Sequence, residues 1–435
     1  MIKRILYTLL IMFPVLASAQ INTDRVMAIG RNALYFEDYV LSIQYFNQVI
    51  NAKPYLSDPY FYRGLAKINL DDFQGAESDC SEAIERNPFV VSAYQVRGLA
   101  RIQQNNFAGA IEDYTKALEF APENIGVWHN MALCRIRQED YKGAKNDLDK
   151  LIAISPRYTK AYLMRGEVDL KQKDTLAAEK DFGKAIEIDR YDADTWASRA
   201  ILRLQQQRYK DAEADFDHAI RLSTRNSGVY INRALARYHQ NNLRGAMSDY
   251  DIALDIDPNN FIGHYNRGLL RAQVGDDNRA IQDFNFVIEM EPDNMMAIFN
   301  RGLLLDQTGD YKGAIKDYST VINEYPNFLL GYQYRAQARR KIGDVKGADA
   351  DEFKVLKAQL DKQNGVDPNK QTADNTENNK TRKKSDKNMN NYRKIVVADN
   401  EEGEEKYKSD YRGRVQDKNV NIVPQPMFVL TYYEK

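Results

Sequence analysis

An alanine recurs every 34 residues along most of this chain, with no slip in register. An aspartate stands three residues after each of these alanines. A fixed small residue at a period of this size indicates a solenoid, in which short stacked repeats each contact only their neighbours. Ten such repeats fit between Thr23 and Lys362. The alanines are Ala76, Ala110, Ala144, Ala178, Ala212, Ala246, Ala280, Ala314 and Ala348.

Residue types are fixed at further positions within each repeat. The fourth residue is usually aromatic, the eighth is glycine or alanine, the twenty-fourth is usually large and apolar, and the thirty-second is often proline. Spacings of three and four within each half predict helices, and the prolines and central turns predict where the helices end. Each repeat is therefore expected to form two antiparallel helices of about 14 residues. The repeats start at Thr23, Ser57, Val91, Ile125, Thr159, Ala193, Ser227, Phe261, Met295 and Leu329.

This pattern resembles the tetratricopeptide repeat (TPR) family over about three-quarters of the chain. Trp or Tyr, Gly or Ala, Ala, Phe or Tyr, Ala and Pro stand where that family's motif has them. The resemblance implies an all-α fold, a right-handed superhelical solenoid of about ten TPR helix-turn-helix repeats. Repeat 8 departs from the motif with His264 in place of the aromatic residue, and repeat 10 has Glu352 at the large apolar position. The departure at the end repeat suits a surface that faces water.

Two charged rows accompany the motif. The seventh residue is arginine in eight repeats, and we expect each arginine to pair with its own repeat's aspartate, because such partly buried pairs fix the register between helices. In repeat 4, where Met131 replaces the arginine, Arg135 is predicted to pair with Asp147 instead. The alternative function for the arginines is anion binding. The arginines are Arg63, Arg97, Arg165, Arg199, Arg233, Arg267, Arg301 and Arg335.

The resemblance places a concave binding groove on the first helix of each repeat. Position six of that helix is asparagine in four repeats, and an asparagine amide can both donate to and accept from a peptide backbone. This suggests an asparagine ladder that holds an extended peptide, although Asn-Arg-Gly is alternatively just a recurrent local sequence of the repeat. The lysine–asparagine clamp by which some relatives capture carboxy-terminal carboxylates is missing. The candidate peptide-binding residues are Asn130, Asn232, Asn266, Asn300, Tyr265, Phe299, Gln273 and Gln307.

Residues 1–19 have the features of a signal peptide. Lys3 and Arg4 precede an apolar stretch that is too short to span a bilayer, and Ala17-Ser18-Ala19 supplies small residues at a cleavage site. The mature chain would begin at Gln20, outside the cytoplasmic membrane. The periplasm is the expected location and the cell surface the alternative, while a retained membrane anchor is the competing interpretation. The composition resembles that of envelope proteins from Bacteroidetes.

Two segments follow the repeats. Residues 363–391 are rich in Asn, Lys, Asp and Thr and are expected to form a disordered linker. Residues 392–435 form a β-prone tail, with apolar runs at 392–397 and 420–433. The tail either caps the apolar edge of the last repeat, or docks onto a partner by adding a strand to its sheet, or is disordered.

The sequence contains no recognisable catalytic motif. Its four histidines are scattered, and it has neither a phosphate-binding loop nor a nucleophile elbow. Cys80 and Cys134 lie at apolar positions of different repeats and are expected to be free and buried, because a disulfide requires Cα atoms within about 7 Å. The net charge of -1 gives no strong field toward nucleic acid or an anionic membrane. We therefore expect no metal, cofactor, nucleic acid or small-molecule substrate, and membrane contact only through a partner.

These features predict a non-catalytic protein–protein interaction scaffold of the bacterial cell envelope. It would bind an extended peptide or a partner protein in the concave groove, around repeats 7 to 9. The alternative is a permanent structural component of an outer-membrane or envelope assembly, docked through its C-terminal tail. A catalytic role, for instance in glycan processing, is a third hypothesis that no set of residues suggests.

Overall fold

The computed structural model describes residues 22–222 and 225–363, and over these residues the chain forms twenty α-helices and no strand. This confirms the predicted all-α fold of about ten helix pairs. The predicted signal peptide, the β-prone tail and nearly all of the predicted linker lie outside the described residues. None of the described helices is both long and apolar enough to cross a membrane.

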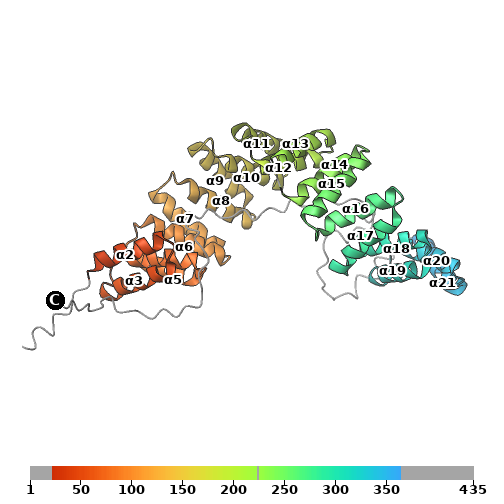
Figure 1. The fold of residues 1–435 in the computed structure, drawn as a ribbon, viewed down its shortest axis with the longest axis horizontal. Coiled ribbons are helices and arrows are strands. Elements are labelled where there is room, and N and C mark those ends of the chain that lie inside the picture. The colour runs from red at the N-terminus through yellow and green to blue at the C-terminus, as the bar shows by residue number, and fades with distance from the viewer. Residues whose placement is uncertain (1–21, 223–224, 364–435) are drawn as a thin grey trace, which may run out of the picture. The chain divides into compact units, whose positions relative to one another are not determined.

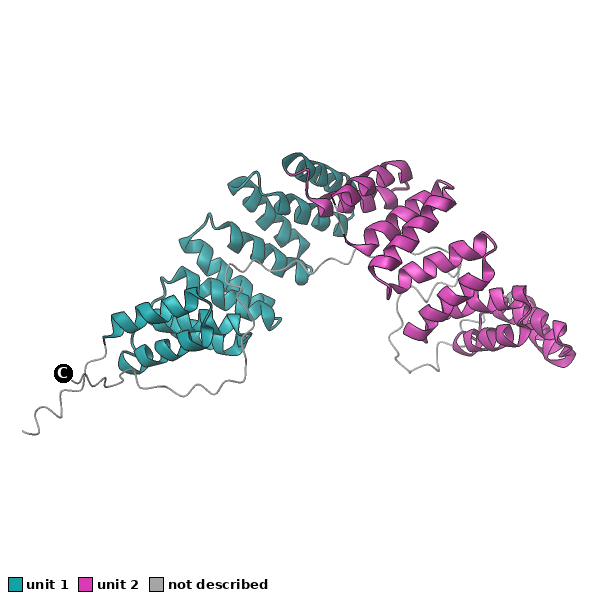
Figure 2. Ribbon diagram, in the orientation of Figure 1, with its two compact units in different colours: residues 1–188, 405–435 teal, residues 189–404 magenta. Residues whose placement is uncertain are grey.

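The described helices, labelled in Figure 1, fall into two compact units that Figure 2 colours separately. The first unit contains repeats 1 to 5. Each repeat contributes two consecutive helices that pack against each other. The helices are α2 (Thr23–Tyr35), α3 (Tyr39–Ala52), α4 (Asp58–Asn69), α5 (Phe73–Arg86), α6 (Val91–Gln103), α7 (Phe107–Phe120), α8 (Ile125–Arg137), α9 (Tyr141–Ile154), α10 (Thr159–Lys171) and α11 (Thr175–Ile188).

The second unit contains repeats 6 to 10 and has the same organisation. Its helices are α12 (Ala193–Gln205), α13 (Tyr209–Arg221), α14 (Ser227–His239), α15 (Leu243–Ile256), α16 (Phe261–Gln273), α17 (Asp277–Met290), α18 (Met295–Thr308), α19 (Tyr311–Glu324), α20 (Leu329–Lys341) and α21 (Val345–Gln363).

The helices begin and end where the repeat pattern predicts. The first helix of each repeat starts at the predicted residue in nine repeats and one residue later, at Asp58, in the other. In every repeat with a proline at position thirty-two, the second helix ends two residues before it, as α19 does before Pro326. Helix α11 ends at the same point although Arg190 replaces the proline, so proline is not required to end the helix.

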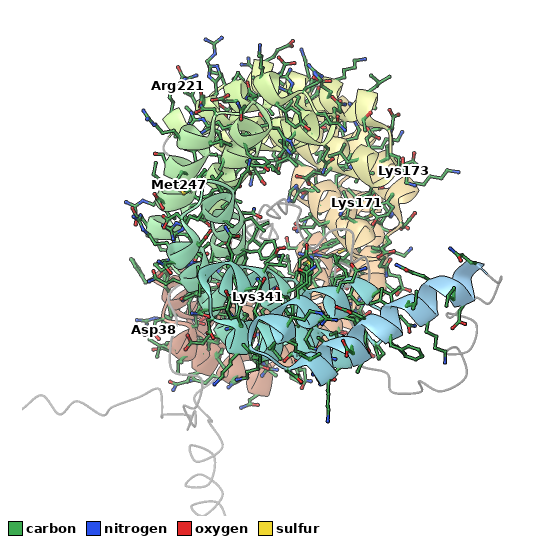
Figure 3. The ribbon with its side chains drawn as sticks, turned by 90° about the vertical axis from the view of Figure 1, so that its right-hand side faces the viewer. Asp38, Lys171, Lys173, Arg221, Met247 and Lys341 are labelled. Carbon is green, nitrogen blue, oxygen red and sulfur yellow. The ribbon has the colours of Figure 1, made fainter. Side chains whose placement is uncertain are left out.

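The turn inside each repeat has a fixed backbone geometry. Its fifteenth residue has a positive φ, between 59° and 93°, in all ten repeats, although only the last three have glycine there. The sixteenth residue is Asp or Asn in nine repeats, and most of these side chains, such as Asp38 (Figure 3), accept a hydrogen bond from an amide of the second helix. Such N-caps satisfy amides that the helix itself leaves unpaired. Arg208 is the exception at this position and makes no such cap.

Small residues bring the paired helices close together. Every alanine of the 34-residue row is 0% exposed. A Cβ atom added at Gly98 would lie 2.7 Å from the ring of Tyr114, so this position tolerates no side chain without displacing the ring. Cys80 and Cys134 are buried and free, as predicted, and burial raises the pKa of both thiols. The core is therefore a stack of small residues faced by large ones.

Candidate functional site

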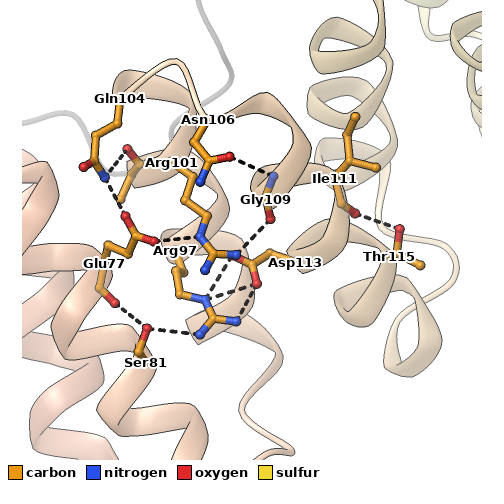
Figure 4. A network of polar contacts seen from close by, with 11 residues as sticks. Glu77, Ser81, Arg97, Arg101, Gln104, Asn106, Gly109, Ile111, Asp113 and Thr115 are labelled. Carbon is orange, nitrogen blue, oxygen red and sulfur yellow. Dashed lines mark hydrogen bonds and ion pairs between the residues drawn. The ribbon is translucent and has the colours of Figure 1, made fainter. Parts of the chain in front are cut away.

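The arginine and aspartate rows meet in a polar seam between the two helices of each repeat. Figure 4 shows it at Arg97, whose Nε and Nη2 donate hydrogen bonds of 3.0 and 2.6 Å to the carboxylate of Asp113. The ring of Tyr94, at position four, lies 5.7 Å from the guanidinium carbon of Arg97. This arrangement combines a bidentate ion pair with a cation–π contact, both of which suit the planar guanidinium.

All eight predicted pairs form, which confirms the ladder. In each, Nε and Nη2 of the arginine donate to the two carboxylate oxygens. Because a carboxylate engages every arginine of this row, the geometry favours a structural role over anion binding. The pairs are Arg63–Asp79, Arg97–Asp113, Arg165–Asp181, Arg199–Asp215, Arg233–Asp249, Arg267–Asp283, Arg301–Asp317 and Arg335–Asp351.

Sequence reasoning missed the third contact of these arginines. Nη1 of seven of them donates to position twenty-five of the preceding repeat, as Arg97 does to Ser81 at 3.1 Å. Each such arginine therefore joins consecutive repeats as well as the two helices of its own. The signal in the sequence was the polar residue that recurs at position twenty-five. These partners are Asn47, Ser81, Asp149, Asp217, Asp251, Asn285 and Ser319.

A second basic row, at position eleven, extends the polar seam. Arg101 donates to Asp113 of its own repeat and to Glu77 of the preceding one, at 3.0 and 2.8 Å. The charges are reversed between repeats 4 and 5, where Lys145 pairs with Asp169 at 2.5 Å. Position eleven therefore forms a second link between neighbouring repeats. The acidic and basic partners of this ion pair can exchange places between the two repeats.

Repeat 4 is the weak point of the polar seam. Arg135 pairs with Asp147 at 3.1 Å, as predicted. This is the contact that position eleven also makes in other repeats, as in Arg101–Asp113, so it does not replace the arginine that is missing at Met131. The Oδ2 atom of Asp147 is buried and has no hydrogen-bond partner among the described residues. Burial raises the pKa of Asp147 to about 7, the charge of Arg135 only partly offsets this effect, and the charge of Asp140 adds to it.

An open pocket lies in the second unit, on the first helices of repeats 7 to 10. Its cavity volume is about 440 Å³, within the range of ligand-binding pockets. Helices α14, α16, α18 and α20 supply most of the wall, with Phe284 from α17. The lining residues are Tyr238, Leu269, Ala272, Gln273, Phe284, Asn300, Leu303, Leu304, Asp306, Gln307 and Tyr334.

Three of the predicted binding residues line this pocket. Gln273 and Gln307 are exposed and stand one repeat apart, at the ends of the first helices of repeats 8 and 9. Asn300 is 5% exposed, and its Nδ2 donates to the carbonyl of Met296 at 2.8 Å and to the hydroxyl of Tyr265 at 3.3 Å. Hydrogen bonds to Met296 and Tyr265 thus hold the Asn300 amide in place, while the side chains of Gln273 and Gln307 are exposed to solvent.

The other candidates are buried or lie elsewhere. Asn232 and Asn266 are both 0% exposed, so the three consecutive asparagines do not present an open ladder to solvent. Asn130 is buried in the first unit. Tyr265 and Phe299 are also buried, and the ring of Phe299 lies 5.9 Å from that of Tyr334, a residue of the pocket wall. These two aromatic residues support the pocket, and a peptide-binding role for the asparagines stays a prediction.

The charge inside the pocket is balanced. Asp306 pairs with Lys341 of the next repeat at 2.9 Å, and the Lys341 ammonium also lies 4.9 Å from the ring centre of Tyr311. The remaining lining residues are apolar, aromatic or amide-bearing. The pocket therefore offers apolar contact and hydrogen bonds without a net charge. The described residues contain no group of three or more His, Cys, Asp or Glu side chains placed to hold a metal ion.

Comparison with known proteins agrees with this repeat organisation. Models of the tetratricopeptide repeat match residues 91–124, 125–158, 159–192, 198–261 and 265–327, more than half of the chain. No curated protein sequence matches the chain.

Solved structures also resemble parts of the chain. A tetratricopeptide repeat protein from Parabacteroides merdae is 21% identical, covers 57% of this chain and 98% of its own, and has a TM-score of 0.45. The C-terminal part of a TPR repeat-containing protein from Cytophaga hutchinsonii is 18% identical, with coverage of 55% and 97% and a TM-score of 0.46. YrrB, described as a TPR protein with an unusual peptide-binding site, is 18% identical, with coverage of 42% and 95% and a TM-score of 0.39.

Proposed function

Because this chain belongs to the tetratricopeptide repeat family, a family of protein-interaction scaffolds, we propose that it binds an extended peptide segment of a partner protein. The binding site is the pocket on α14, α16, α18 and α20. The observation that carries the proposal is that this pocket, in which Lys341 balances the charge of Asp306, combines exposed amides with apolar walls. Its expected role is non-catalytic.

The pocket repeats itself along the array, as an extended ligand requires. Leu269 and Leu303 are one repeat apart and are both half-buried, and Gln273 and Gln307 follow each of them by one helical turn. An extended peptide presents backbone donors and acceptors at regular intervals, and its side chains alternate between two sides. We infer that the glutamine amides bind the backbone while the leucines and Tyr334 contact side chains that point inward.

The test uses the full mature chain and linear peptides selected from a displayed random library. Replacing both exposed glutamines (Q273A/Q307A) should weaken peptide binding about tenfold, because each lost hydrogen bond costs about 0.5–1.5 kcal/mol. Helical circular dichroism should not change, since neither side chain is buried. The matched control is Q103A, an exposed glutamine at the same position of repeat 3 in the first unit.

Two results would argue against this site. Selected peptides that bind the Q273A/Q307A chain as tightly as the unaltered chain would place the binding surface elsewhere. A native partner that is retained by that variant but lost on deletion of residues 392–435 would favour the alternative, a structural component docked through its tail.

We further propose that the protein acts in the bacterial cell envelope, in the periplasm or at the cell surface, after removal of residues 1–19. The sequence of this segment supports the proposal. Mass spectrometry of the protein exported from a producing bacterium should find an N-terminus at Gln20. Full-length protein in the cytoplasmic fraction would contradict it.

A further inference from the structure

The last helix of the array carries an apolar face at a position that other repeats bury. Position twenty-eight is isoleucine or leucine in all ten repeats, and it is buried or half-buried in the first nine. Ile322 on α19 shows the reason for this burial. Its side chain is 4% exposed because helix α20 lies against it, so closely that a Cβ atom added at Gly331 of α20 would be 3.0 Å from Cγ1 of Ile322. This side chain is therefore the surface on which the following helix packs.

In the tenth repeat the same position is open. Leu356 on α21 is 52% exposed, and two further apolar side chains, Phe353 (67%) and Leu360 (48%), are exposed beside it. Spacings of three and four residues place all three on one face of the helix. The terminal repeat of a solenoid normally needs a polar outer face to remain soluble. This end of the array instead presents the apolar face of an internal repeat, which implies that something covers it.

The chain itself supplies a suitable cover. Helix α21 ends at Gln363, and 72 further residues, 364–435, continue directly from the end of this apolar face. Residues 364–391 of that segment are polar, and two apolar runs follow, a short one at 392–397 and a longer one at 420–433. The intervening 56 residues can span far more than the length of α21, at about 3.3 Å per extended residue. A tethered segment also competes well against a separate molecule, because the tether raises its effective concentration at the face.

We propose that residues 420–433 pack onto Phe353, Leu356 and Leu360 and close the C-terminal end of the array. The run contains Met427, Phe428, Val429 and Leu430, which match an apolar face of this kind, and burying both surfaces removes them from water together. Residues 364–419, between the two surfaces, would form the loop that this packing requires.

The experiment measures access to α21 in the full chain. A cysteine is introduced at the centre of the face (L356C), and its rate of reaction with a maleimide is compared with and without F428S/L430S in the tail. The two native cysteines are buried and contribute little background. K354C reports an exposed site on another side of α21, and Y407S/Y411S is a matched tail variant outside the apolar run.

The proposal predicts that F428S/L430S speeds labelling of L356C about tenfold, while Y407S/Y411S does not, and that K354C reacts at the same rate in every background. Equal labelling of L356C with and without F428S/L430S overturns the proposal. Protection that persists in F428S/L430S and disappears on dilution also overturns it, because a second copy of the chain would then cover the face.

Discussion

Replacing Met131 with arginine should stabilise the protein, and the gain should depend on pH. In the eight repeats that have an arginine at position seven, where repeat 4 has Met131, the Nε and Nη2 atoms of that arginine donate to the aspartate at position twenty-three. The guanidinium introduced by M131R would give the buried Oδ2 of Asp147 the hydrogen bond that it now lacks. It would also stand three residues after Trp128, in the register in which Arg199 lies 5.0 Å from the ring of Trp196.

The magnitude follows from the pKa of Asp147. Its value of about 7 lies some three units above the ordinary value of 3.8, and each unit corresponds to about 1.4 kcal/mol, so the buried carboxylate costs up to about 4 kcal/mol when ionised. The other aspartates of the row also bear a burial penalty, and solvent screens part of the charge. We therefore expect M131R to recover about half of the cost of ionising Asp147, which raises the free energy of unfolding by about 2 kcal/mol at pH 7.5.

The sign of the pH dependence is a stronger test than the magnitude. Because the folded pKa of Asp147 is raised, folded protein holds this proton between pH 4 and 7 while unfolded protein has lost it. Asp147 therefore destabilises the folded state progressively as the pH rises from 4 to 7. The gain from M131R should be close to zero at pH 4, below about 1 kcal/mol at pH 5, and fully present at pH 7.5.

Native-state hydrogen exchange of the α8 and α9 amides measures the change in unfolding free energy of repeat 4 itself. A local measurement is needed because a long repeat array does not always unfold in a single two-state transition. M131L is the matched control, since it keeps the buried apolar volume and adds no donor. A gain that does not change between pH 4 and 7.5 would refute the reasoning, as would a gain of equal size in M131L.

Three further predictions concern the turns, the polar seam and the thiols. R208D should restore the missing N-cap of α13 and raise its protection from hydrogen exchange by about 1 kcal/mol. K145E should destabilise the contact between repeats 4 and 5, and adding D169R should recover most of that loss in a double-mutant cycle, because Glu–Arg is the arrangement of the other repeats. Cys80 and Cys134 should react with thiol reagents at pH 8 only on unfolding, since burial raises the pKa of Cys134 to about 12 and also raises that of Cys80.

The repeat register was predictable because every position in it has a local physical cause. Small residues at fixed spacing determine which helices approach each other, and an arginine with an aspartate in the same repeat can pair only across that contact. The pairing of Arg135 with Asp147 followed from the same reasoning, since Arg135 stands one helical turn after Met131. These predictions needed only the contacts within one repeat.

The binding surface was less predictable because it depends on how much of each helix the neighbouring repeats cover. Periodicity shows which residues share a face of a helix, but it does not show how much of that face the neighbouring repeats bury. Asn232 and Asn266 lie one residue from the arginine row and are fully buried, whereas Gln273 and Gln307, at the ends of their helices, remain exposed. The positive φ at non-glycine residues such as Lys173 (Figure 3) was not predicted, because its signal, the glycine at the same position of repeats 8 to 10, lies in other repeats.

The measurement that tests the central claim most directly is site-specific photo-crosslinking in the full mature chain. A benzophenone side chain placed at Gln307 should capture a library-selected peptide, while the same group at Gln103, the equivalent position of repeat 3, should not. Capture at Gln307 that a second, unlabelled peptide abolishes is the predicted result. Capture at Gln103 alone, or equal capture at both positions, would contradict peptide recognition by the pocket on α14, α16, α18 and α20.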